Sequence, residues 1–407
     1  MSHVLIIGGG LGGLCLAQAL KKHGIPFKLF EKDERKDFRA QGYRLRVSDE
    51  GVDALEYALP PELYELFKDT CAGKQTFGVR LDADGADLSN QQSGGPPPLK
   101  GDKSYVVDRT TFREVLLRGL EDSVFFGKAL DRYILHEDHV TAYFTDGSAI
   151  DGGLIVGADG VHSRVRRQLV PGFRAIDTGL RIIYGKTPLT LDFEASFPEE
   201  YRRGVSLVQE KIQRENDDGS FQHTLFYEPI RFPCANTVAD PRLPAPYIYW
   251  VLCSTAMPLP DEELLHLTHD ESAQLSLRLT QHWTPVLRVL LEMQDVSQTS
   301  TLRVASAPPD LPAWEVSRRV TLLGDAIHPM PPTGAMGVVT ALRDVEDLAR
   351  RIVAAGGVAA MEEARIAEYE ESLRQFARNA IALSWRGGNR GFGLKKVEER
   401  LDCLIDM

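Results

Sequence analysis

The chain opens on a short apolar run that passes into glycines and then into a segment of helical periodicity. Residues 4–7 (VLII) predict a buried strand, because a continuous apolar run of this length is typical of parallel sheets. Residues 14–24 carry apolar side chains at helical spacing and end in a glycine. Residues 27–33 (FKLFEKD) predict a second strand. The order strand, glycine-rich turn, helix and strand predicts one βαβ unit.

The same strand-to-glycine pattern returns twice, at residues 154–160 (LIVGADG) and 320–326 (VTLLGDA). Two long amphipathic helices are expected after the second of these, at about 337–353 and 361–384. Between about 172 and 306 the chain instead alternates apolar and polar residues in strands broken by prolines, followed by helices near 261–266 and 272–293. The glycine-rich segment 387–393 is interpreted as a helix stop and surface turn.

These patterns predict an α/β fold, in which a Rossmann-like nucleotide-binding domain is interleaved with a smaller mixed β-sheet domain and followed by long C-terminal helices. The nucleotide-binding domain is expected to comprise residues 1–73, 103–171 and 301–407. Residues 74–102 and 172–300 are expected to form the substrate domain. Residues 89–103 are the most loop-like segment of the chain.

Composition narrows the range of partners. Of the 407 residues, 47 are Lys or Arg and 58 are Asp or Glu, so the net charge of −11 argues against nucleic acid or an anionic membrane as the main partner. The five cysteines form no CxxC pair, which argues against a disulfide framework or a zinc site and favours a reducing compartment. No apolar stretch approaches the length of a membrane span. We therefore expect a cytoplasmic monomer or homodimer without a metal.

The first candidate site is Gly8-x-Gly10-x-x-Gly13, between the first strand and the first helix. In this pattern the first glycine permits a tight turn, the second lets the backbone approach a pyrophosphate, and the third lets the helix pack close to the strand. Glu31 ends the second strand 18 residues after Gly13 (31 − 13), near the spacing expected for an acid that binds a ribose. The motif predicts a dinucleotide without separating FAD from NAD.

Two further motifs place an acid and a glycine at the end of an apolar strand. The first contains Asp159 within GADGxxSxVR, and the second contains Asp325 within GDAxHP, followed by Pro332-x-Gly334-x-x-Gly337. Ligands bind at the carboxyl ends of strands in such sheets. The alternative for each motif alone is a capped strand–turn–helix junction, with Asp159 or Asp325 as the helix cap.

The order of the three motifs resembles the class A FAD-dependent aromatic monooxygenases of the p-hydroxybenzoate hydroxylase type. Arg39, Gly42 and the run YRLRVSDEGVDAL resemble the family's stretch after the second strand, and Val107-x-Arg109 resembles its V-x-R element. The resemblance covers nearly the whole chain. It implies non-covalent FAD, NAD(P)H as a transient co-substrate and O2.

The resemblance also implies roles for particular residues. The three glycines of the first motif would hold the FAD pyrophosphate, Glu31 the adenosine ribose and Asp325 the ribityl chain. Asp159 lies in the motif that the family uses for both FAD and reduced nicotinamide nucleotide. Where the family often has GQG and an Asn, this chain has Ala335-Met336-Gly337 and valines, so the backbone must carry that contact. The full set of cofactor-binding residues implied in this way is Gly8, Gly10, Gly13, Glu31, Arg109, Asp159, Gly324, Asp325, Gly334 and Gly337.

The activity implied is insertion of one oxygen atom of O2 into a small aromatic or polyketide-like substrate of secondary metabolism, by hydroxylation through a C4a-hydroperoxyflavin. Epoxidation, Baeyer–Villiger insertion, a flavin oxidase or dehydrogenase, and a non-catalytic nucleotide sensor remain alternatives. The catalytic residues are unknown, and the candidates on the substrate side are Arg181, Tyr184 and Tyr227. Because side chains alternate along a strand, only half of the aromatic residues there can face the substrate.

Overall fold

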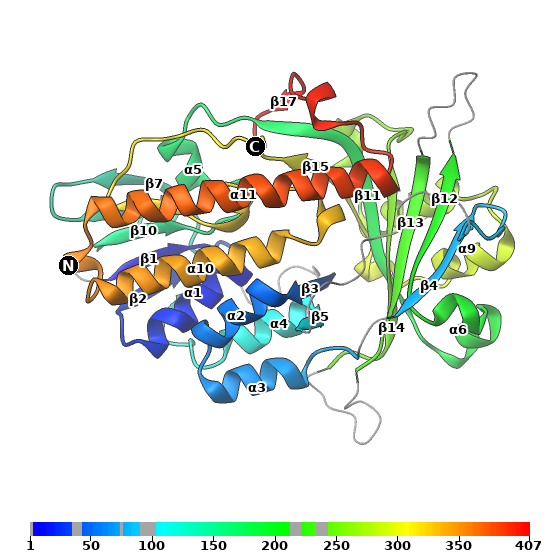
Figure 1. Cartoon of the computed structure of the whole chain (residues 1–407), viewed down its shortest axis with the longest axis horizontal. Helices are drawn as coiled ribbons and strands as arrows, with labels where there is room; N and C mark the ends of the chain where they lie inside the picture. The colour runs from blue at the N-terminus through cyan, green and yellow to red at the C-terminus, as the bar shows by residue number, and fades with distance from the viewer. Residues whose placement is uncertain (1–2, 35–42, 74–75, 90–102, 212–220, 233–242) are drawn as a thin grey trace.

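The computed structural model describes residues 3–34, 43–73, 76–89, 103–211, 221–232 and 243–407. Arg39, Gly42 and most of the predicted loop 89–103 lie outside the described residues. Figure 1 shows the chain as two halves, with a parallel sheet and long helices on one side and a large sheet on the other. None of the helices in the described ranges is long and apolar enough to cross a membrane.

The parallel half is built on five strands in the order β16-β10-β1-β2-β6, and all of the neighbouring pairs are parallel. The βαβ unit is present as expected, with α1 (Leu11–Lys22) between β1 and β2. The predicted α/β fold with a Rossmann-like sheet is confirmed. The strands are β1 (Val4–Ile7), β2 (Phe27–Phe30), β6 (Val124–Phe125), β10 (Leu154–Gly157) and β16 (Val320–Leu322).

The second half is a mixed sheet in the order β15-β11-β14-β13-β12-β4, with β17 paired to the start of β11. Its pairs are antiparallel except that β12 and β4 run parallel. The expected domain boundary at residues 300 and 301 falls inside β15, and the division into two domains stays a prediction. The strands are β4 (Phe77–Asp82), β11 (Ala175–Pro188), β12 (Val205–Lys211), β13 (Phe221–Ile230), β14 (Tyr247–Ser254), β15 (Ser300–Ser306) and β17 (Leu404–Ile405).

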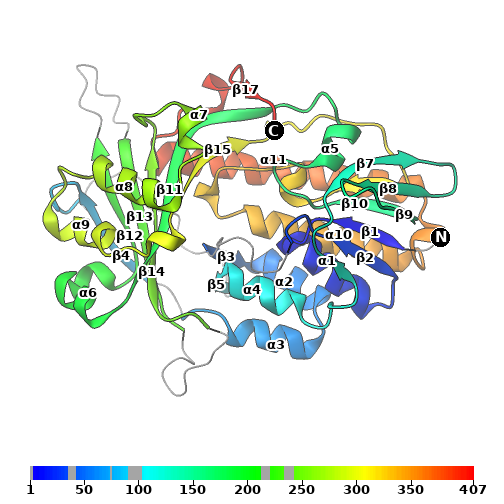
Figure 2. The same cartoon turned by 180° about the vertical axis from the view of Figure 1, so that it is seen from behind.

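The two faces of this large sheet pack against different partners. One face carries Ile183, Leu225 and Leu252 and forms an apolar cluster with the outer helices. Those helices are α6 (Leu191–Ser196), α7 (Asp261–Leu264), α8 (His269–Leu279) and α9 (Pro285–Glu292). The other face belongs to the main core and looks toward the parallel half, as Figures 1 and 2 show from opposite sides.

Smaller elements fill the space between the two halves and cover the parallel sheet. The antiparallel pair of β3 (Arg44–Ser48) and β5 (Ser104–Asp108) lies beside the large sheet. A three-stranded sheet consists of β7 (Leu130–Leu135), β8 (Val140–Phe144) and β9 (Ala149–Gly152), and Asp146-Gly147 forms the turn between β8 and β9. The remaining helices of this half are α2 (Asp49–Ala58), α3 (Pro61–Asp69), α4 (Arg109–Leu117), α5 (Arg164–Leu169), α10 (Gly337–Ala354) and α11 (Glu363–Gly391).

Two helix boundaries differ from the sequence prediction. The last helix continues through Gly387 and Gly388 instead of ending there, because these glycines pack against another segment: a Cβ on Gly387 would lie 2.7 Å from the carbonyl oxygen of Thr333. The helix expected at 272–293 is divided into α8 and α9. Pro285 starts α9 because proline is accepted in the first turn of a helix but not in its interior.

The contact between α11 and the parallel sheet buries an acid. Glu370 has no exposed surface, and its Oε1 accepts a hydrogen bond of 2.8 Å from the Thr321 hydroxyl on β16. Its Oε2 has no hydrogen-bond partner among the described residues. Burial raises the pKa of Glu370 to about 7, and the nearby Trp314 side chain, the Thr321 hydrogen bond and the charge of Arg374 offset only part of that effect.

We expect Glu370→Gln to stabilise the protein at pH 8 but not at pH 5. The pKa of Glu370 in the folded state, about 7, lies above that of an unfolded glutamate, so wild-type stability falls as pH rises between roughly 4.3 and 7. The full effect is of the order of 3 kcal/mol, and glutamine removes it. Urea unfolding at both pH values measures this difference.

Glu371→Gln is the matched control, because the Glu371 side chain is 55% exposed on the next position of the same helix. It should change stability by less than about 0.5 kcal/mol at either pH. Equal behaviour of the two variants at pH 8 would contradict the buried charge assigned to Glu370.

Candidate functional site

The three glycine motifs meet at the carboxyl ends of β1, β10 and β16, which are neighbours in the parallel sheet. The first and second motifs touch directly, since a Cβ on Gly8 would lie 2.3 Å from the Ala158 carbonyl oxygen. The second and third are joined by Arg166, which is buried and donates from Nη1 to the Ala326 carbonyl oxygen at 2.8 Å. The structure thus brings all three motifs to one edge of the sheet.

The glycines of the first motif differ in their surroundings. A Cβ on Gly13 would lie 2.0 Å from the Gly8 carbonyl oxygen, so only glycine allows α1 to approach β1 this closely. A Cβ on Gly10 would meet nothing within 4 Å. Gly10 is also the N-cap of α1 and provides no side chain to the first-turn amides. This end of α1 therefore offers open space and free N–H groups, which suits a phosphate.

Glu31 lies against the first motif at the end of β2. Its carboxylate is buried and accepts hydrogen bonds from the Gly9 amide at 2.6 Å and the Asp33 amide at 2.9 Å. Arg113, which the sequence analysis missed, donates from Nε to the Gly9 carbonyl oxygen at 3.0 Å. The spacing of Arg113 could have indicated it, because Arg113 lies one helical turn after Arg109 and on the same face of α4.

Arg109 and Asp325 lie close enough for the charge of one to act on the other. Burial raises the pKa of Asp325, whereas the positive charges of His328 and Arg109 lower it. The Asp325 side chain nevertheless keeps a surface that solvent can reach. The Arg109 guanidinium lies 5.2 Å from the centre of the Tyr43 ring. In the described part of the chain neither side chain has a hydrogen-bond or ion-pair partner. Both are available to a ligand.

Asp159 has a different environment. Its carboxylate accepts hydrogen bonds from the Ser163 hydroxyl and from the amides of Arg164 at 2.7 Å and Val165 at 3.3 Å. Burial raises its pKa, and these hydrogen bonds oppose the shift. The geometry is that of the capped junction considered as the alternative for this motif. A role of Asp159 toward a cofactor stays a prediction.

The segment from Pro332 to Gly337 joins the third motif to α10. A Cβ on Gly334 would lie 2.6 Å from the Ser384 Oγ, so the glycine allows this loop to pack on α11. Ala335 has a φ of 53°, in the left-handed region. A Cβ on Gly337 would meet nothing within 4 Å, and no side chain caps the start of α10. As at α1, a helix begins with free amides next to open space.

His328 and Asp344 fix the third motif to α10. Both are buried, the His328 Nε2 lies 2.6 Å from the Asp344 Oδ2, and the Gly324 amide donates to the same oxygen at 2.9 Å. Burial alone would lower the pKa of His328, but the Asp344 carboxylate raises it overall. His328 therefore holds its own loop. The sequence analysis missed Asp344, although an acid on the apolar face of α10 four residues before Leu348 was a signal.

A second buried carboxylate, Asp108, ties the two halves together. It caps α4 by accepting from the Thr110 and Thr111 amides at 2.9 and 3.2 Å. Its other oxygen accepts from Lys186 on β11 at 2.7 Å and from the Tyr247 hydroxyl on β14 at 2.8 Å. The cap of the helix that begins with Arg109 is thus also a joint to the large sheet.

Of the three candidates on the substrate side, the structure brings only Tyr184 to the motifs. Tyr184 lies 5.8 Å from Tyr43, ring centre to ring centre, on the inner face of the large sheet. Tyr227 lies on the outer face, fully buried and 5.9 Å from Phe197. Arg181 also points outward and pairs with Asp177 at 2.8 Å and Asp261 at 2.6 Å.

The inner face of the large sheet is lined by aromatic residues. Strand register sets Tyr184 and Phe226 on either side of Val251, and Tyr249 pairs with Lys186 and Glu228 one row further along. Phe226 and Tyr249 lie 6.4 Å apart, with their rings edge to face. These aromatic side chains form a wall opposite the three glycine motifs, a composition that suits a planar organic molecule.

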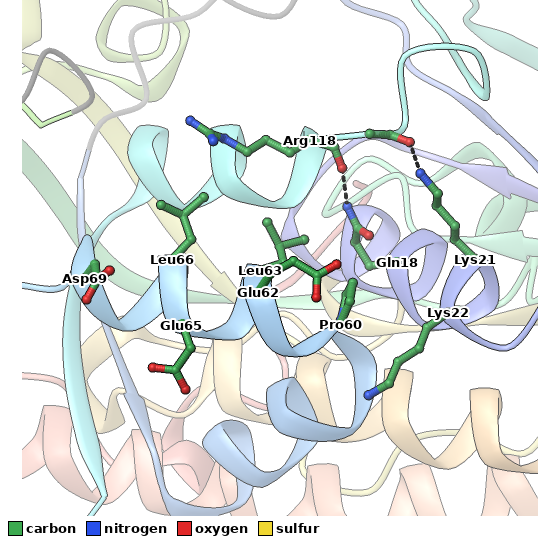
Figure 3. Close-up of a pocket in the computed structure, with 11 residues that line it drawn as sticks. Gln18, Lys21, Lys22, Pro60, Glu62, Leu63, Glu65, Leu66, Asp69 and Arg118 are labelled. Atoms are coloured by element: carbon green, nitrogen blue, oxygen red, sulfur yellow. Dashed lines mark hydrogen bonds between the residues drawn. The ribbon is translucent and has the colours of Figure 1, made fainter.

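No group of metal-ligating side chains that could hold an ion occurs among the residues described. A groove of about 690 Å³ lies elsewhere, between α1, α3 and the end of α4 (Figure 3). Its lining mixes acidic and basic side chains, and Lys21 and Gln18 already donate to backbone carbonyl groups there. The groove contains none of the motif residues.

The glycine contacts predict opposite effects for two alanine substitutions. Gly13→Ala should destabilise the apoprotein by about 3 kcal/mol or more, because the new methyl overlaps the Gly8 carbonyl group.

Gly10→Ala should leave the apoprotein within about 0.5 kcal/mol of wild type but weaken FAD binding at least about tenfold, because its methyl occupies the open space. Thermal unfolding of apoprotein and quenching of FAD fluorescence measure the two effects. Unchanged FAD affinity in Gly10→Ala would refute the phosphate site.

Asp344→Asn should destabilise the protein by about 3 kcal/mol, because it leaves His328 buried without its anionic partner. Asp347→Asn, three residues later on the same helix, is the control. Asp347 pairs with Arg351 at a partly exposed position, so its loss should cost less than about 1 kcal/mol. Chemical denaturation of both variants tests this, and similar losses would contradict the anchoring role of Asp344.

Comparison with known proteins identifies the family. The family model described as "FAD binding domain" matches residues 103–384, more than half of the chain, and the model described as "NAD(P)-binding Rossmann-like domain" matches residues 6–66. In structure the chain resembles a Photorhabdus luminescens protein described as an FAD-containing monooxygenase, with a TM-score of 0.79 and 28% identity over 96% of this chain and 99% of that one.

Curated relatives agree. The chain is 39% identical to the dual O-methyltransferase/FAD-dependent monooxygenase CTB3 of Cercospora beticola, over 98% of this chain and 47% of that protein. It thus spans about half the length of that relative. It is 29% identical to the 3-amino-4-hydroxybenzoate 2-monooxygenase of Streptomyces cremeus, over 91% of this chain and 82% of that enzyme. The chain therefore belongs to the FAD binding domain family.

Proposed function

We propose that this chain consumes NAD(P)H and O2 and inserts one oxygen atom into a small aromatic or polyketide-like substrate, by hydroxylation. The observation that carries the proposal is the pairing of an aromatic wall with an edge of free ligand-binding groups. The wall contains Tyr184, Phe226 and Tyr249. The opposite edge offers Arg109 and Asp325, neither of which has a hydrogen-bond or ion-pair partner in the described ranges. Such an arrangement suits a flavin held against a planar substrate.

The residues present fit FAD. The open space at Gly10 and the uncapped start of α1 suit the pyrophosphate, and Arg109 supplies a positive charge nearby. Asp325 would accept hydrogen bonds from ribityl hydroxyls, and the open start of α10 at Gly337 would stabilise negative charge on the reduced ring system. When bound, FAD supplies the electron transfer from NAD(P)H and the activation of O2.

The protein's own task is then positioning and exclusion of water. Tyr249 is 9% exposed and Tyr184 6% exposed, so the wall is largely dry. A dry site protects reactive oxygen species from hydrolysis and uncoupled release. The name of the Streptomyces cremeus relative, which states an aromatic substrate, supports the same substrate class.

A cluster of basic side chains supports NAD(P)H as the reductant. His162 lies within the second motif, and its pKa is lowered by burial and then by the positive charges of Lys32 and Arg167. Several positive charges thus lie near the glycine motifs, where they would attract the phosphates of a nicotinamide nucleotide.

The described cysteines are free thiols, which supports a reducing, cytoplasmic setting.

The oxygen reaction tests this proposal. The purified flavoprotein is reduced chemically without oxygen and then mixed with oxygenated buffer, while the flavin spectrum is followed. We expect a transient spectrum distinct from both the reduced and the oxidised forms, and incorporation of label from ¹⁸O2 into the product of a phenolic substrate. Direct return to the oxidised spectrum, with one peroxide formed for each substrate consumed and no label in the product, would instead make the protein an oxidase.

A further inference from the structure

Two adjacent glycines lie in the last part of α11, where they weaken the helix. A glycine inside a helix costs about 1 kcal/mol relative to alanine, so Gly387 and Gly388 oppose the structure that contains them. These glycines leave room for Thr333. A Cβ on Gly387 would lie 2.7 Å from the Thr333 carbonyl oxygen, and a Cβ on Gly388 would lie 3.1 Å from its Oγ1. A local cost of this kind is expected where a function requires the packing.

The segment that packs on the two glycines leads directly into the start of α10. The Thr333 hydroxyl donates to the Ser384 carbonyl oxygen at 2.6 Å, and a Cβ on the next residue, Gly334, would lie 2.6 Å from the Ser384 Oγ. Ser384 lies one helical turn before the two glycines, on the same face of α11. The residues at 335–339 are Ala, Met, Gly and two valines, which offer no polar side chain to hold the segment in place. Its position therefore depends on α11.

The end of α11, one turn further on, is held by the large sheet. The Gly391 carbonyl oxygen accepts hydrogen bonds from Gln209 Nε2 on β12 at 2.9 Å and from Thr224 Oγ1 on β13 at 3.2 Å. The last carbonyl groups of a helix have no partners within it, so these two side chains cap the helix. Both are buried, and Arg80 Nε on β4 donates to Gln209 Oε1 at 2.7 Å. Figure 1 shows α11 reaching from the parallel half to the large sheet.

The cap lies on the same face of the sheet as the aromatic wall. Thr224 pairs with Gln209 across two strands, and the next residue on β13, Leu225, packs with the outer helices. Since side chains alternate along a strand, Thr224 shares the inner face of β13 with Phe226. From the two glycines to the cap the helix rises only about 6 Å, at 1.5 Å per residue. One short helical segment thus contacts both the segment before α10 and the sheet that carries the wall.

We propose that the last turn of α11 is a positioning element for the flavin, because it fixes the start of α10 relative to the large sheet. This rests on the proposed function, in which the open amides at Gly337 stabilise negative charge on the reduced ring system. Gly337 follows Thr333 by four residues (337 − 333), so a shift of the segment that packs on α11 moves those amides. Gly387 and Gln209 are then the residues that set the separation between the cofactor edge and the aromatic wall.

The reduction potential of the bound flavin tests the first contact, because it compares the affinities of the protein for reduced and oxidised FAD. Gly387→Ala places a methyl group against the Thr333 backbone and displaces the amides of α10. We expect the affinity for reduced FAD to fall at least about fivefold relative to that for oxidised FAD, which lowers the two-electron potential by about 20 mV. The affinity for oxidised FAD should stay within about threefold, since Gly10 and Arg109 are unchanged. Global destabilisation alone would not move the potential of the folded holoprotein.

Gly391→Ala is the matched control, because it adds the same methyl group to the same helix at a point with nothing within 4 Å, and keeps the carbonyl group. The ratio of the two affinities should stay within about 1.5-fold of wild type. Gln209→Met tests the other end, since it removes a donor to the Gly391 carbonyl group and places no atom near Thr333. It should lower the ratio at least about threefold. An equal shift in Gly391→Ala would make the effect a general property of the helix and overturn the proposal.

The double variant distinguishes one shared element from two independent ones. If both residues act through the last turn of α11, Gly387→Ala with Gln209→Met should shift the ratio no further than Gly387→Ala alone. Multiplication of the two single effects would overturn the link to the large sheet. If Gly387→Ala does not fold, Gln209→Met decides alone: a wild-type ratio overturns the proposal, and a lowered ratio supports it. None of these readouts requires NAD(P)H or O2, so a failure of the monooxygenase proposal is recognised separately by the ¹⁸O2 experiment.

Discussion

The near-contact of two backbone segments, Gly13 and the Gly8 carbonyl group, is the constraint on which the site depends. With a distance of 2.0 Å from an ideal Cβ to that oxygen, no side chain is possible at Gly13. Only this approach seats the start of α1 at the carboxyl end of β1, where its free amides are aimed at one place. A Cβ on Gly8 would likewise overlap the Ala158 carbonyl group, so glycine at this position allows the end of the neighbouring strand β10 to pack against the first motif.

The polar contacts of the site extend this packing rather than replace it. Arg166 links the second motif to the third by its hydrogen bond to the Ala326 carbonyl group. Asp344 links the third motif to α10 through His328 and the Gly324 amide. Each of these groups is buried, so its hydrogen bonds compete little with water. Arg109 and Asp325, which have no hydrogen-bond or ion-pair partner among the described residues, face outward from this framework.

The sequence allowed the parallel half to be predicted because its signals are local. An apolar run followed by glycines defines a strand, a turn and a helix within about twenty residues. The inner face of the large sheet was not predictable in the same way. Period-two alternation places Tyr184 and Tyr227 on one face or the other of the sheet. Which face depends on strand pairing over long distances in the sequence, since Tyr184 pairs with Val251, 67 residues later, and Tyr227 with Trp250, 23 residues later. Arg181, Tyr184 and Tyr227 could therefore not be separated.

Long-range contacts also account for the other misses. Gly387 suggests a helix stop when considered alone, yet the nearby Thr333 backbone makes glycine a requirement of helix packing. The ion pair between Arg44 and Glu228 joins residues 184 positions apart (228 − 44), and the sequence holds no local pattern that joins them. Asp344 was recognisable in principle, because a charge on an apolar helix face implies a buried partner.

The shared cap at Asp108 makes the two halves a single mechanical unit. Because one carboxylate binds both the first turn of α4 and the Lys186 and Tyr247 side chains of the large sheet, a hinge opening between the halves would have to break the contacts of the residue that caps that turn. Arg109 is the first residue of that turn. Movement of the large sheet away from the parallel half would therefore disturb the cap of the turn that carries Arg109.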